Sequence, residues 1–504
     1  MRSRKLALHR LVGSCSALLL GSVLSVAPAQ ARTLGEVEFE PCILTSAGMP
    51  RPTEAQCATL TVPENPAEPE GRSIDLALAW IPVDGEAEPD PVFMIAGGPG
   101  QSARESYPMI ESAFRDIARS RHILLLDQRG TGGSNLLACD GEEEAEAFLG
   151  IEDFSPERIR EFTRSCVEDL QEKADLRFYG TREAVFDLDF VRRALGAEQV
   201  NLVGVSYGTR VAQQYAKTHP AHTRSVILDS VLPPGLALGA EHAANLQDAL
   251  NAHFARCRET PACTEAFGDP QAQLDEVAAR LREGGLAPVR YRDPTTGAWR
   301  EEAPTYDHFA GVMRMYAYSA VSAAVLPLLV HQAEQGQYET LLATMRMLAR
   351  DLSGQMASGM HNSVVCTEDA QDLREQYRAQ PSAEGTLLGD RFVEFLELVC
   401  EVWPRGTRPD DFREPLTGEL PVLLVSGEYD PVTPPRYGDQ VAAHLENARH
   451  LVLNGQGHSL LGAGCMPELA AQFIEQADAG ELDASCLERL AAPPPFSGLY
   501  GWEP

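Results

Sequence analysis

Residues 200–209 read Val-Asn-Leu-Val-Gly-Val-Ser-Tyr-Gly-Thr, and this stretch decides the fold. The apolar run over 200–205 predicts a buried strand, and the residues from Thr209 to Lys217 can form a helix. Between them, Gly204-Val-Ser-Tyr-Gly208 has the spacing Gly-x-Ser-x-Gly, in which small residues let a serine sit on a tight strand-to-helix turn. The pattern is weak by itself, but its place between a strand and a helix predicts that Ser206 is a nucleophile and not part of a plain structural turn.

Short apolar runs like this one recur along the chain and alternate with segments of helical spacing, such as Arg182 to Leu195. Several runs end in Gly or Asp, as in the Asp127-Gln-Arg-Gly130 segment. Buried strands that alternate with helices indicate a mainly parallel sheet, with its ligand site at the carboxyl ends of the strands. The other expected strands are 74–83, 91–96, 122–126, 225–228, 422–425 and 450–453.

A serine hydroxyl needs a base to remove its proton, and the best candidate for that base is His458. It lies in Asn454-Gly-Gln-Gly-His-Ser459, a glycine-rich turn directly after an expected strand. His444 and His450 are its nearest rivals, but the first sits in a helical pattern and the second begins a strand. The alternative role for any of these histidines is a place in a surface turn.

The base needs an acid that orients it, and in this kind of fold the chain order is serine, acid, histidine. Asp430 fits this order, because it lies just past an expected strand in Ser426-Gly-Glu-Tyr-Asp-Pro-Val432. Glu428 and Asp439 are alternatives, although Glu428 sits closer to the end of the strand. The sequence therefore predicts a catalytic triad of Ser206, Asp430 and His458.

Gly97-Gly-Pro-Gly100 follows the strand that should supply an oxyanion-binding donor. A glycine there lets the backbone come close to a tetrahedral intermediate and present an N–H group. We expect Gly98 to supply one donor and the N–H of Tyr207 to supply the other. A phosphate-binding loop is the competing interpretation, but the chain contains neither Gly-x-x-x-x-Gly-Lys-Ser/Thr nor a Gly-x-Gly-x-x-Gly that opens a helix.

Together these motifs resemble the α/β-hydrolase peptidases of the prolyl aminopeptidase and tripeptidyl aminopeptidase group. The resemblance implies the α/β-hydrolase fold, a mainly parallel sheet flanked by helices with a large helical cap insertion. Tyr207 after the serine and a cysteine-bearing C-terminal extension are more similar to the tripeptidyl branch, whereas Gln101-Ser-Ala103 departs from the glycine-rich continuation of both branches. The segments that carry the resemblance are Gly97-Gly-Pro-Gly100, Asp127-Gln-Arg-Gly130, Gly204-Val-Ser-Tyr-Gly-Thr209, Gly427-Glu-Tyr-Asp-Pro-Val-Thr-Pro434 and Gly455-Gln-Gly-His458.

The strand-helix rhythm breaks between Pro233 and about Glu419, where the chain becomes helix-like and rich in Ala, Leu, Glu and Arg. This stretch is too long for a connection, so it predicts a helical insertion. The expected domains are residues 32–235 and 415–504 for the two parts of the α/β-hydrolase core and 236–414 for the cap. Two roles are open for several apolar residues of the cap: they line a binding surface, or they form the hydrophobic core of the helices. These residues are Val312, Met313, Met315, Tyr316 and Tyr318.

An enzyme that acts on a free amino terminus needs carboxylates that hold the α-ammonium group of its substrate. Glu368 and Asp369 are the candidates, because they follow the short apolar run Val364-Val-Cys366, which a disulfide could anchor. The alternative is that they are solvated acids that open a helix before Leu373.

Residues 1–31 are expected to be a signal peptide. Four basic residues within 1–10 precede an apolar stretch over about 11–26, and Ala29-Gln-Ala31 supplies the small-x-small pattern of a cleavage site. A membrane anchor is the alternative, but the uninterrupted apolar run is short for a span. Cys15 resembles a lipoprotein signal only faintly, because the apolar run follows it. We therefore expect an exported protein, secreted or periplasmic in a bacterium, with no stable membrane association after cleavage.

Cysteine usage agrees with export. Without Cys15 an even number of ten cysteines remains, which in an exported chain indicates disulfides. Metal binding would need paired ligands such as Cys-x-x-Cys, which the sequence lacks, so no metal site is expected. Because short loops close most readily, we predict pairing between neighbours: Cys42–Cys57, Cys139–Cys166, Cys257–Cys263, Cys366–Cys400 and Cys465–Cys486.

The excess of acidic residues over basic ones limits the classes of partner that the protein can bind. Acidic residues outnumber basic ones by 73 to 42, for a net charge of −31, which argues against a nucleic-acid partner. We predict a serine hydrolase that needs no cofactor and takes a peptide substrate, an aminopeptidase that releases short N-terminal units (tripeptidyl or prolyl type) through an acyl-enzyme. An exported carboxylesterase with the same triad is the alternative, and an inactive fold used for binding is a third.

Overall fold

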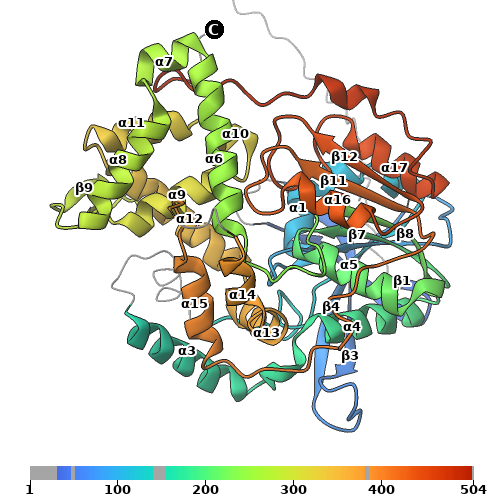
Figure 1. Cartoon of the computed structure of the whole chain (residues 1–504). Coiled ribbons are helices and arrows are strands. Elements are labelled where there is room, and N and C mark those ends of the chain that lie inside the picture. Colours follow the sequence, from blue (N-terminus) through green and yellow to red (C-terminus); the bar gives the residue numbers. More distant parts are fainter. Residues whose placement is uncertain (1–30, 47–50, 84, 140–154, 381–384, 502–504) are drawn as a thin grey trace, which may run out of the picture. The chain divides into compact units, whose positions relative to one another are not determined.

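The computed structural model describes residues 31–46, 51–83, 85–139, 155–380 and 385–501, so the expected signal peptide lies almost wholly outside the described residues. Its centre is a ten-stranded sheet in the order β1-β2-β3-β4-β6-β5-β7-β8-β11-β12 (Figure 1). The strands are β1 (Arg32–Leu34), β2 (Val37–Leu44), β3 (Thr53–Pro63), β4 (Ser73–Ile81), β5 (Val92–Ile95), β6 (Ile123–Leu126), β7 (Val200–Val205), β8 (Thr223–Asp229), β11 (Val422–Gly427) and β12 (Ala448–Leu453).

The six strands from β6 to β12 in this order run parallel, as the apolar runs predict. Their burial follows from sequence, since β5, β6 and β11 are buried at every residue, which is typical of strands covered on both faces. The sequence analysis predicts no strand before residue 74, whereas β1 to β3 pair with β4 to form an antiparallel extension of the sheet. In β2 the buried Val37 and Phe39 alternate with the exposed Glu38 and Glu40, the pattern of a strand with one solvated face.

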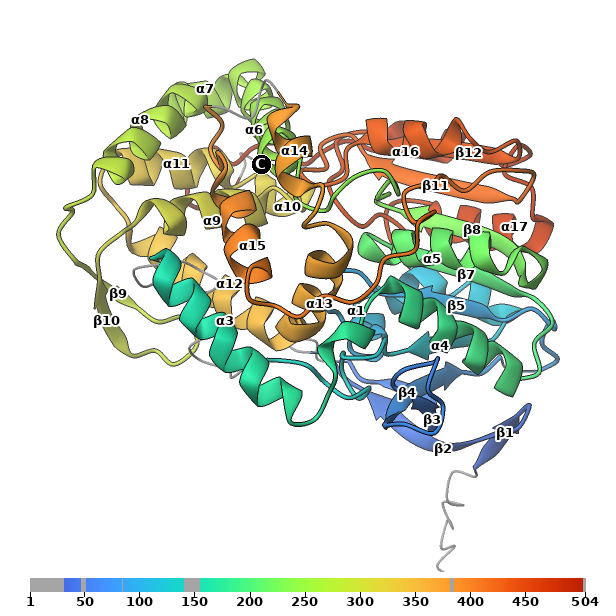
Figure 2. The ribbon, with the colours of Figure 1, turned by 60° about the horizontal axis from the view of Figure 1, so that its bottom comes forward.

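Helices cover both faces of the sheet, so two apolar clusters lie on opposite sides of it. Leu202 of β7 belongs to the cluster under α4 and α5, whereas its neighbour Val203 belongs to the cluster under α1 and α17. Successive strand residues point to opposite faces, which explains this division. Figure 2 shows α4 and α5 on the same side of the strands. These helices of the core are α1 (Ala103–Phe114), α4 (Thr181–Ala194), α5 (Tyr207–Thr218), α16 (Pro435–Ala442) and α17 (Met466–Gln476).

The chain between β8 and β11 forms the cap, which is helical apart from one two-stranded hairpin that the sequence analysis missed. Helices α6, α8, α9, α11 and α12 share an apolar core of their own. By contrast, α13 and α15 add Met360, Val364 and Val399 to the main core cluster, so residues 31–504 form one compact unit. The elements are α6 (His242–Glu259), α7 (Pro261–Phe267), α8 (Pro270–Glu283), β9 (Val289–Arg292), β10 (Trp299–Glu302), α9 (Tyr306–Tyr316), α10 (Ala320–Ala323), α11 (Leu326–Glu334), α12 (Glu339–Gln355), α13 (Ser358–Glu368), α14 (Leu373–Arg378) and α15 (Arg391–Cys400).

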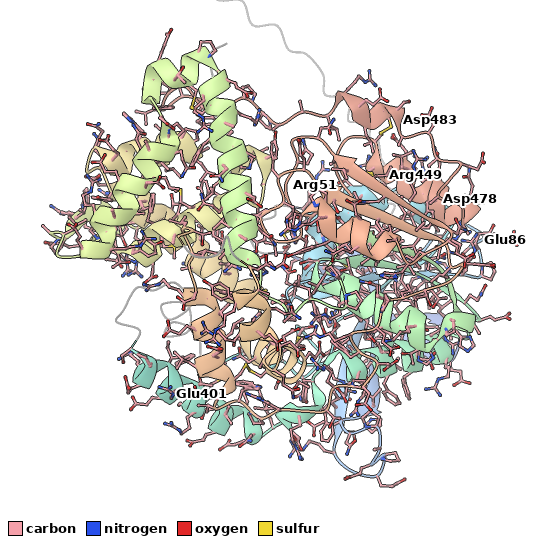
Figure 3. The ribbon with its side chains drawn as sticks, in the orientation of Figure 1. Arg51, Glu86, Glu401, Arg449, Asp478 and Asp483 are labelled. Carbon is pink, nitrogen blue, oxygen red and sulfur yellow. A yellow bond between two sulfur atoms is a disulfide. The ribbon has the colours of Figure 1, made fainter. Side chains whose placement is uncertain are left out.

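Helix α3 (Pro156–Gln171) precedes the predicted insertion in sequence but packs beside the cap helix α15. An ion pair supports this contact, with 2.8 Å between Arg160 Nε and the carboxylate of Glu401, which is labelled beside α3 in Figure 3. Four single-turn helices complete the description: η1 (Ile117–Arg119), η2 (Leu176–Phe178), η3 (Pro220–His222) and η4 (Ser485–Arg489).

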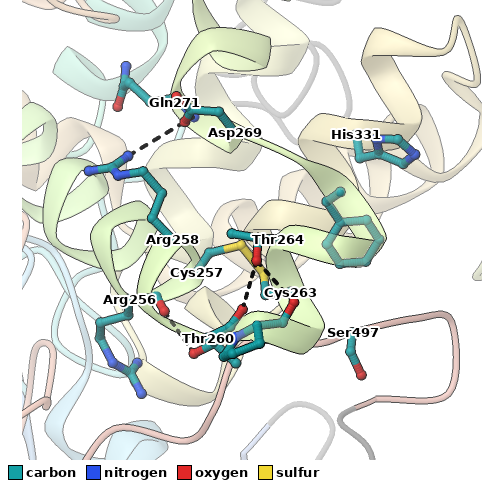
Figure 4. Close-up of a disulfide and its surroundings, with 12 residues drawn as sticks. Arg256, Cys257, Arg258, Thr260, Cys263, Thr264, Asp269, Gln271, His331 and Ser497 are labelled. Atoms are coloured by element: carbon teal, nitrogen blue, oxygen red, sulfur yellow. Dashed lines mark hydrogen bonds and ion pairs between the residues drawn. A yellow bond between two sulfur atoms is a disulfide. The ribbon is translucent and has the colours of Figure 1, made fainter.

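All five disulfides predicted between neighbouring cysteines are present. Cys42–Cys57 joins β2 to β3, and Cys366–Cys400 joins α13 to α15. Cys257–Cys263 joins α6 to α7 at the tip of the cap, where the Thr260 and Thr264 hydroxyls bond to nearby carbonyl groups (Figure 4). Such bridges are typical of proteins that mature in an oxidising compartment.

Two kinds of feature are absent from the described residues. Within the part of the chain that the structure describes, no helix combines the length and apolar character that a bilayer span requires. The same residues contain no cluster of three or more His, Cys, Asp or Glu side chains arranged to hold a metal ion.

Candidate active site

Ser206 occupies the turn between β7 and α5 with φ of 55° and ψ of −122°, a strained conformation for a residue with a side chain. Gly204 and Gly208, on either side of the serine, have no room for a side chain. A Cβ atom on Gly204 would lie 2.4 Å from the carbonyl oxygen of Gly208, and one on Gly208 would lie 2.3 Å from the carbonyl oxygen of Ile95. The turn thus has the geometry that exposes a nucleophile above the carboxyl end of a parallel sheet.

The structure pairs His458 with Asp430, as the sequence predicts. His458 Nδ1 lies 2.8 Å from Asp430 Oδ2. The other oxygen of Asp430 accepts the backbone N–H groups of Val432 and Thr433 at 2.8 and 2.9 Å. The Thr433 hydroxyl donates to Oδ2 at 2.8 Å, so every position of the buried carboxylate is occupied and its orientation is fixed.

Two groups that the sequence analysis did not assign hold the loop that carries His458. Asp229, at the end of β8, accepts the N–H groups of Leu460 and Leu461 at 2.7 and 3.0 Å. From the cap side, the carbonyl of Tyr318 accepts the N–H of His458 at 2.7 Å, and the Tyr318 ring contacts the imidazole edge to face. The signal for Asp229 was present in the sequence, since it is an acid directly after a strand, as Asp430 is.

The charges around His458 set its pKa. Burial alone lowers the pKa of the imidazole, but the charge and hydrogen bond of Asp430, together with the charge of Asp229, raise it above the usual 6.5. Burial likewise raises the pKa of the Asp430 carboxyl, but His458 and the backbone donors outweigh burial and lower it. The imidazolium form of His458 is therefore stabilised where an acyl transfer would generate it.

The pH dependence of activity should report this pairing. Because only the neutral imidazole can accept a proton, we expect kcat/KM to fall as the pH is lowered through a midpoint above 6.5. Asp430→Asn removes the charge that raises the pKa of His458, so the midpoint should move to lower pH while kcat also falls. Rates on p-nitrophenyl acetate between pH 5 and 9 measure both. A midpoint below 6.5 in the unmodified enzyme would contradict the assignment of His458 as the base.

A second serine, histidine and acid make a similar chain of hydrogen bonds. Ser426 Oγ lies 2.9 Å from His450 Nε2, and His450 Nδ1 lies 2.8 Å from Asp439 Oδ1. Ser426 is nonetheless fully buried in β11 and does not line the pocket that contains Ser206, so we interpret this chain of hydrogen bonds as structural. The other acid considered from sequence, Glu428, accepts the N–H of Gly455 at 2.7 Å and stabilises the turn before His458.

The two predicted oxyanion donors lie beside Ser206. Gly98 has φ of +105°, a conformation that favours glycine, and Gly97 is so close that its Cβ would lie 3.0 Å from Cβ of Ser206. Tyr207 is the first residue of α5, so its N–H has no acceptor within the helix and lies at the positive end of the helix dipole. Gly98, Tyr207 and Ser206 line one pocket, as oxyanion binding requires.

This pocket has a volume of about 430 Å³ and lies between the sheet and the cap. Of the five cap residues considered from sequence, Met315 and Tyr318 line it, whereas Val312 and Met313 are buried in the cap core. No aspartate or glutamate of the described residues lines it. Its apolar wall includes Ile159, Phe162, Leu232, Leu238, Met315, Leu352, Met356, Phe392, Phe395, Leu396 and Val399.

The prediction that Glu368 and Asp369 bind the amino group of a substrate is wrong. Both are buried and neither lines the pocket; Arg210 Nη1 lies 3.3 Å from Glu368 and 2.9 Å from Asp369. Glu368 also accepts the N–H and hydroxyl of Thr181 at 2.6 and 2.9 Å, and that hydroxyl lies 2.8 Å from the Tyr207 hydroxyl. Through Arg210 and Thr181, the two acids therefore stabilise helix α5 and the turn that carries Ser206. Burial raises the pKa of Glu368 to about 7 despite the charge of Arg210.

The fold and this site together define a serine hydrolase of the α/β-hydrolase class. Two family models match the sequence, "alpha/beta hydrolase fold" over residues 90–266 and "TAP-like protein" over residues 386–486. These matches support an α/β hydrolase with a TAP-like C-terminal segment.

Relatives with established names share about a quarter of their residues with this chain over most of its length. Serine protease Hip1 of Mycobacterium tuberculosis is 26% identical over 500 residues, which cover 91% of this chain and 93% of the relative. Tripeptidyl aminopeptidase of Streptomyces coelicolor is 26% identical over 446 residues, covering 81% and 77%. Carboxylesterase B of M. tuberculosis is 26% identical over 453 residues, covering 81% and 82%.

Proposed function

We propose that this protein is an exported serine peptidase that cleaves acyl bonds through an acyl-enzyme on Ser206. The observation that carries the proposal is the convergence of three parts on one pocket: the strained serine turn, the Asp430–His458 pair at 2.8 Å and the Gly98 loop. None of these parts requires a metal or an organic cofactor for acyl transfer.

The chemistry follows from the positions of these groups. Ser206 Oγ attacks the substrate carbonyl while His458 Nε2 takes its proton, and Asp430 stabilises the resulting imidazolium. The N–H groups of Gly98 and Tyr207 bind the oxyanion. His458 then gives its proton to the leaving nitrogen or oxygen, and the acyl-enzyme forms. Water attacks that ester, again with His458 as base, and Ser206 regains its proton as the acid product leaves.

For the substrate, we propose a peptide with an apolar segment on the acyl side, in keeping with the apolar wall of the pocket. Relatives named serine protease and tripeptidyl aminopeptidase support a peptidase, including the release of short N-terminal units. A second candidate, a carboxylesterase, is favoured by one observation: the described lining of the pocket offers no carboxylate to a substrate ammonium group. The relative named carboxylesterase is compatible with this candidate.

Export is part of the proposal. Five disulfides support folding in an oxidising compartment, and the N-terminal sequence has the pattern of a signal peptide. Mass spectrometry of the protein secreted by its host would test this part through the position of the mature N-terminus.

A panel of matched substrates separates the candidates. We expect turnover of an apolar tripeptidyl p-nitroanilide with a free amino group and loss of that turnover in Ser206→Ala. If the N-acetylated tripeptidyl p-nitroanilide is cleaved equally well, the enzyme is a peptidase that does not require a free amino terminus on its substrate. If only the corresponding p-nitrophenyl ester is cleaved, the carboxylesterase is correct and the peptidase is not.

A further inference from the structure

Arg314, on α9 of the cap, places a full positive charge in the wall of a mainly apolar pocket. The contacts of its guanidinium group are with uncharged partners. Nη2 lies 3.4 Å from Nδ1 of His242, and the guanidinium stacks over the ring of Phe392 at 4.5 Å. Among the described residues, no carboxylate oxygen lies within ion-pair distance of Arg314. This differs from Arg129 and Arg210, which are buried in the same chain and are each paired with an acid.

The two other titratable groups near Arg314 do not balance its charge. Burial, together with the positive charge of Arg314, lowers the pKa of both His242 and His361, so both rings are neutral at pH 7. His242 also senses the charges of His458 and Asp430, and the Nδ1 atom of His361 lies 3.2 Å from the carbonyl of Pro99 in the oxyanion loop. His242 thus contacts Arg314 directly, and His361 contacts the oxyanion loop.

Arg314 is also close to the triad in space. Tyr318, whose carbonyl accepts the N–H of His458 at 2.7 Å, lies just beyond the C-terminal end of α9. Arg314, Tyr318 and Ser206 line the same pocket of about 430 Å³, so the guanidinium can reach a group on a substrate whose carbonyl is bound at Ser206.

We infer that Arg314 selects substrates that carry an anionic group, a carboxylate, a few bonds away from the scissile carbonyl. The inference deepens the proposed function, on which it rests, because it names the charge of the substrate. A neutral substrate that filled the pocket would remove Arg314 from water without a partner, which costs free energy, whereas a carboxylate would form a charge-assisted and often bidentate hydrogen bond with it. In a peptide the carboxylate is either an acidic side chain on the acyl side or the terminal carboxylate of a short leaving peptide.

Two pairs of isosteric esters distinguish these positions. The first pair carries the charge on the acyl side: 4-nitrophenyl hydrogen glutarate and the corresponding glutaramate, in which an amide replaces the carboxylate. The second pair carries it on the leaving group: 4-acetoxybenzoate and 4-acetoxybenzamide. We expect the unmodified enzyme to prefer the anionic member of one pair, and that pair locates the carboxylate.

Arg314→Gln should lower kcat/KM for the preferred anionic ester by about 10- to 100-fold and leave its amide partner within about threefold. Arg314→Lys, which keeps the charge but loses the planar fork, should retain part of the preference. Arg290→Gln, in the exposed β9 strand of the same cap, is the matched control and should leave both rates unchanged. An anionic-to-amide rate ratio that is the same in Arg314→Gln and the unmodified enzyme, for both pairs, would overturn the inference.

Binding measured in the Ser206→Ala background separates this inference from the proposed function. The probes are the 4-nitroanilides of glutaric acid and of glutaramide, with calorimetry as the readout. Tighter binding of the acid, lost when Arg314→Gln is added, supports anion recognition even if Ser206 proves not to be the nucleophile. Equal binding of the acid and the amide to both variants, together with unchanged rate ratios, excludes it.

Discussion

Ser206→Ala is expected to lower kcat by about 10⁴- to 10⁶-fold while the protein remains folded. In the proposed mechanism this hydroxyl forms the acyl-enzyme, and its removal leaves only substrate binding and the oxyanion donors to promote attack by a water molecule. Turnover of 4-nitrophenyl acetate measures the loss, and labelling with a fluorophosphonate probe identifies the reactive serine directly, since the label forms a covalent bond to an activated hydroxyl.

The chain supplies its own control for this prediction. Ser426 makes the same kind of hydrogen-bonded chain with His450 and Asp439 but is fully buried. Ser426→Ala should therefore keep both turnover and labelling. Labelling that persists in Ser206→Ala and disappears in Ser426→Ala would reverse the assignment and show that the site opens elsewhere.

Arg210→Met is expected to destabilise the fold by about 3–5 kcal/mol, the usual cost of leaving buried charges without their partner. Arg210 is fully buried, with Nη1 2.9 Å from Asp369 and 3.3 Å from Glu368. Its surface counterpart is Arg160, which pairs with the exposed Glu401. Arg160→Met should cost no more than about 1 kcal/mol, because solvent screens that pair. Urea unfolding followed by fluorescence compares the two.

The loss of folding stability caused by Arg210→Met should also depend on pH. Glu368 has a pKa of about 7 in the folded protein, above its ordinary 4.5, so it destabilises the fold as the pH rises from about 4.5 to 7. Arg210 opposes this by lowering the pKa of Glu368, and without Arg210 the carboxylate form becomes still more costly. The difference in stability between Arg210→Met and the unmodified protein should therefore widen from pH 5 to pH 8. A difference that is equal at both pH values would mean that Glu368 is not coupled to Arg210.

The triad could be predicted from sequence because each of its members lies shortly after the end of a strand. In a parallel sheet, all carboxyl ends meet at one edge, so Ser206, Asp430 and His458 are brought together by topology alone. The disulfides were predictable for a similar reason, since each joins neighbours along the chain. By contrast, the roles of Glu368 and Asp369 depend on Arg210, a residue more than 150 positions away, and no local pattern indicates which charges will meet in the core.

The binding pocket was less predictable than the triad. Arg314 and Tyr318 lie in a segment whose apolar spacing fits helix core, and only the packing of the cap on the sheet turns one face of that segment toward Ser206. The first strands were missed because an alternation such as that of β2 is short and interrupted by Pro41. Helix α3 joins the wall of the pocket from outside the predicted insertion, a contact that depends on tertiary packing.

The order of the strands also has a consequence for biogenesis. The serine turn is complete once β7, β8 and α5 have been synthesised, but β11 and β12, which carry Asp430 and His458, emerge only after the whole cap. A nascent chain therefore possesses its nucleophile for more than two hundred codons before its base. Because a serine hydroxyl without a base is a poor nucleophile, the nascent chain is catalytically inactive until His458 has been synthesised. Activity therefore requires β11 and β12 to join the sheet, so it cannot begin before the last strands of the chain have been synthesised.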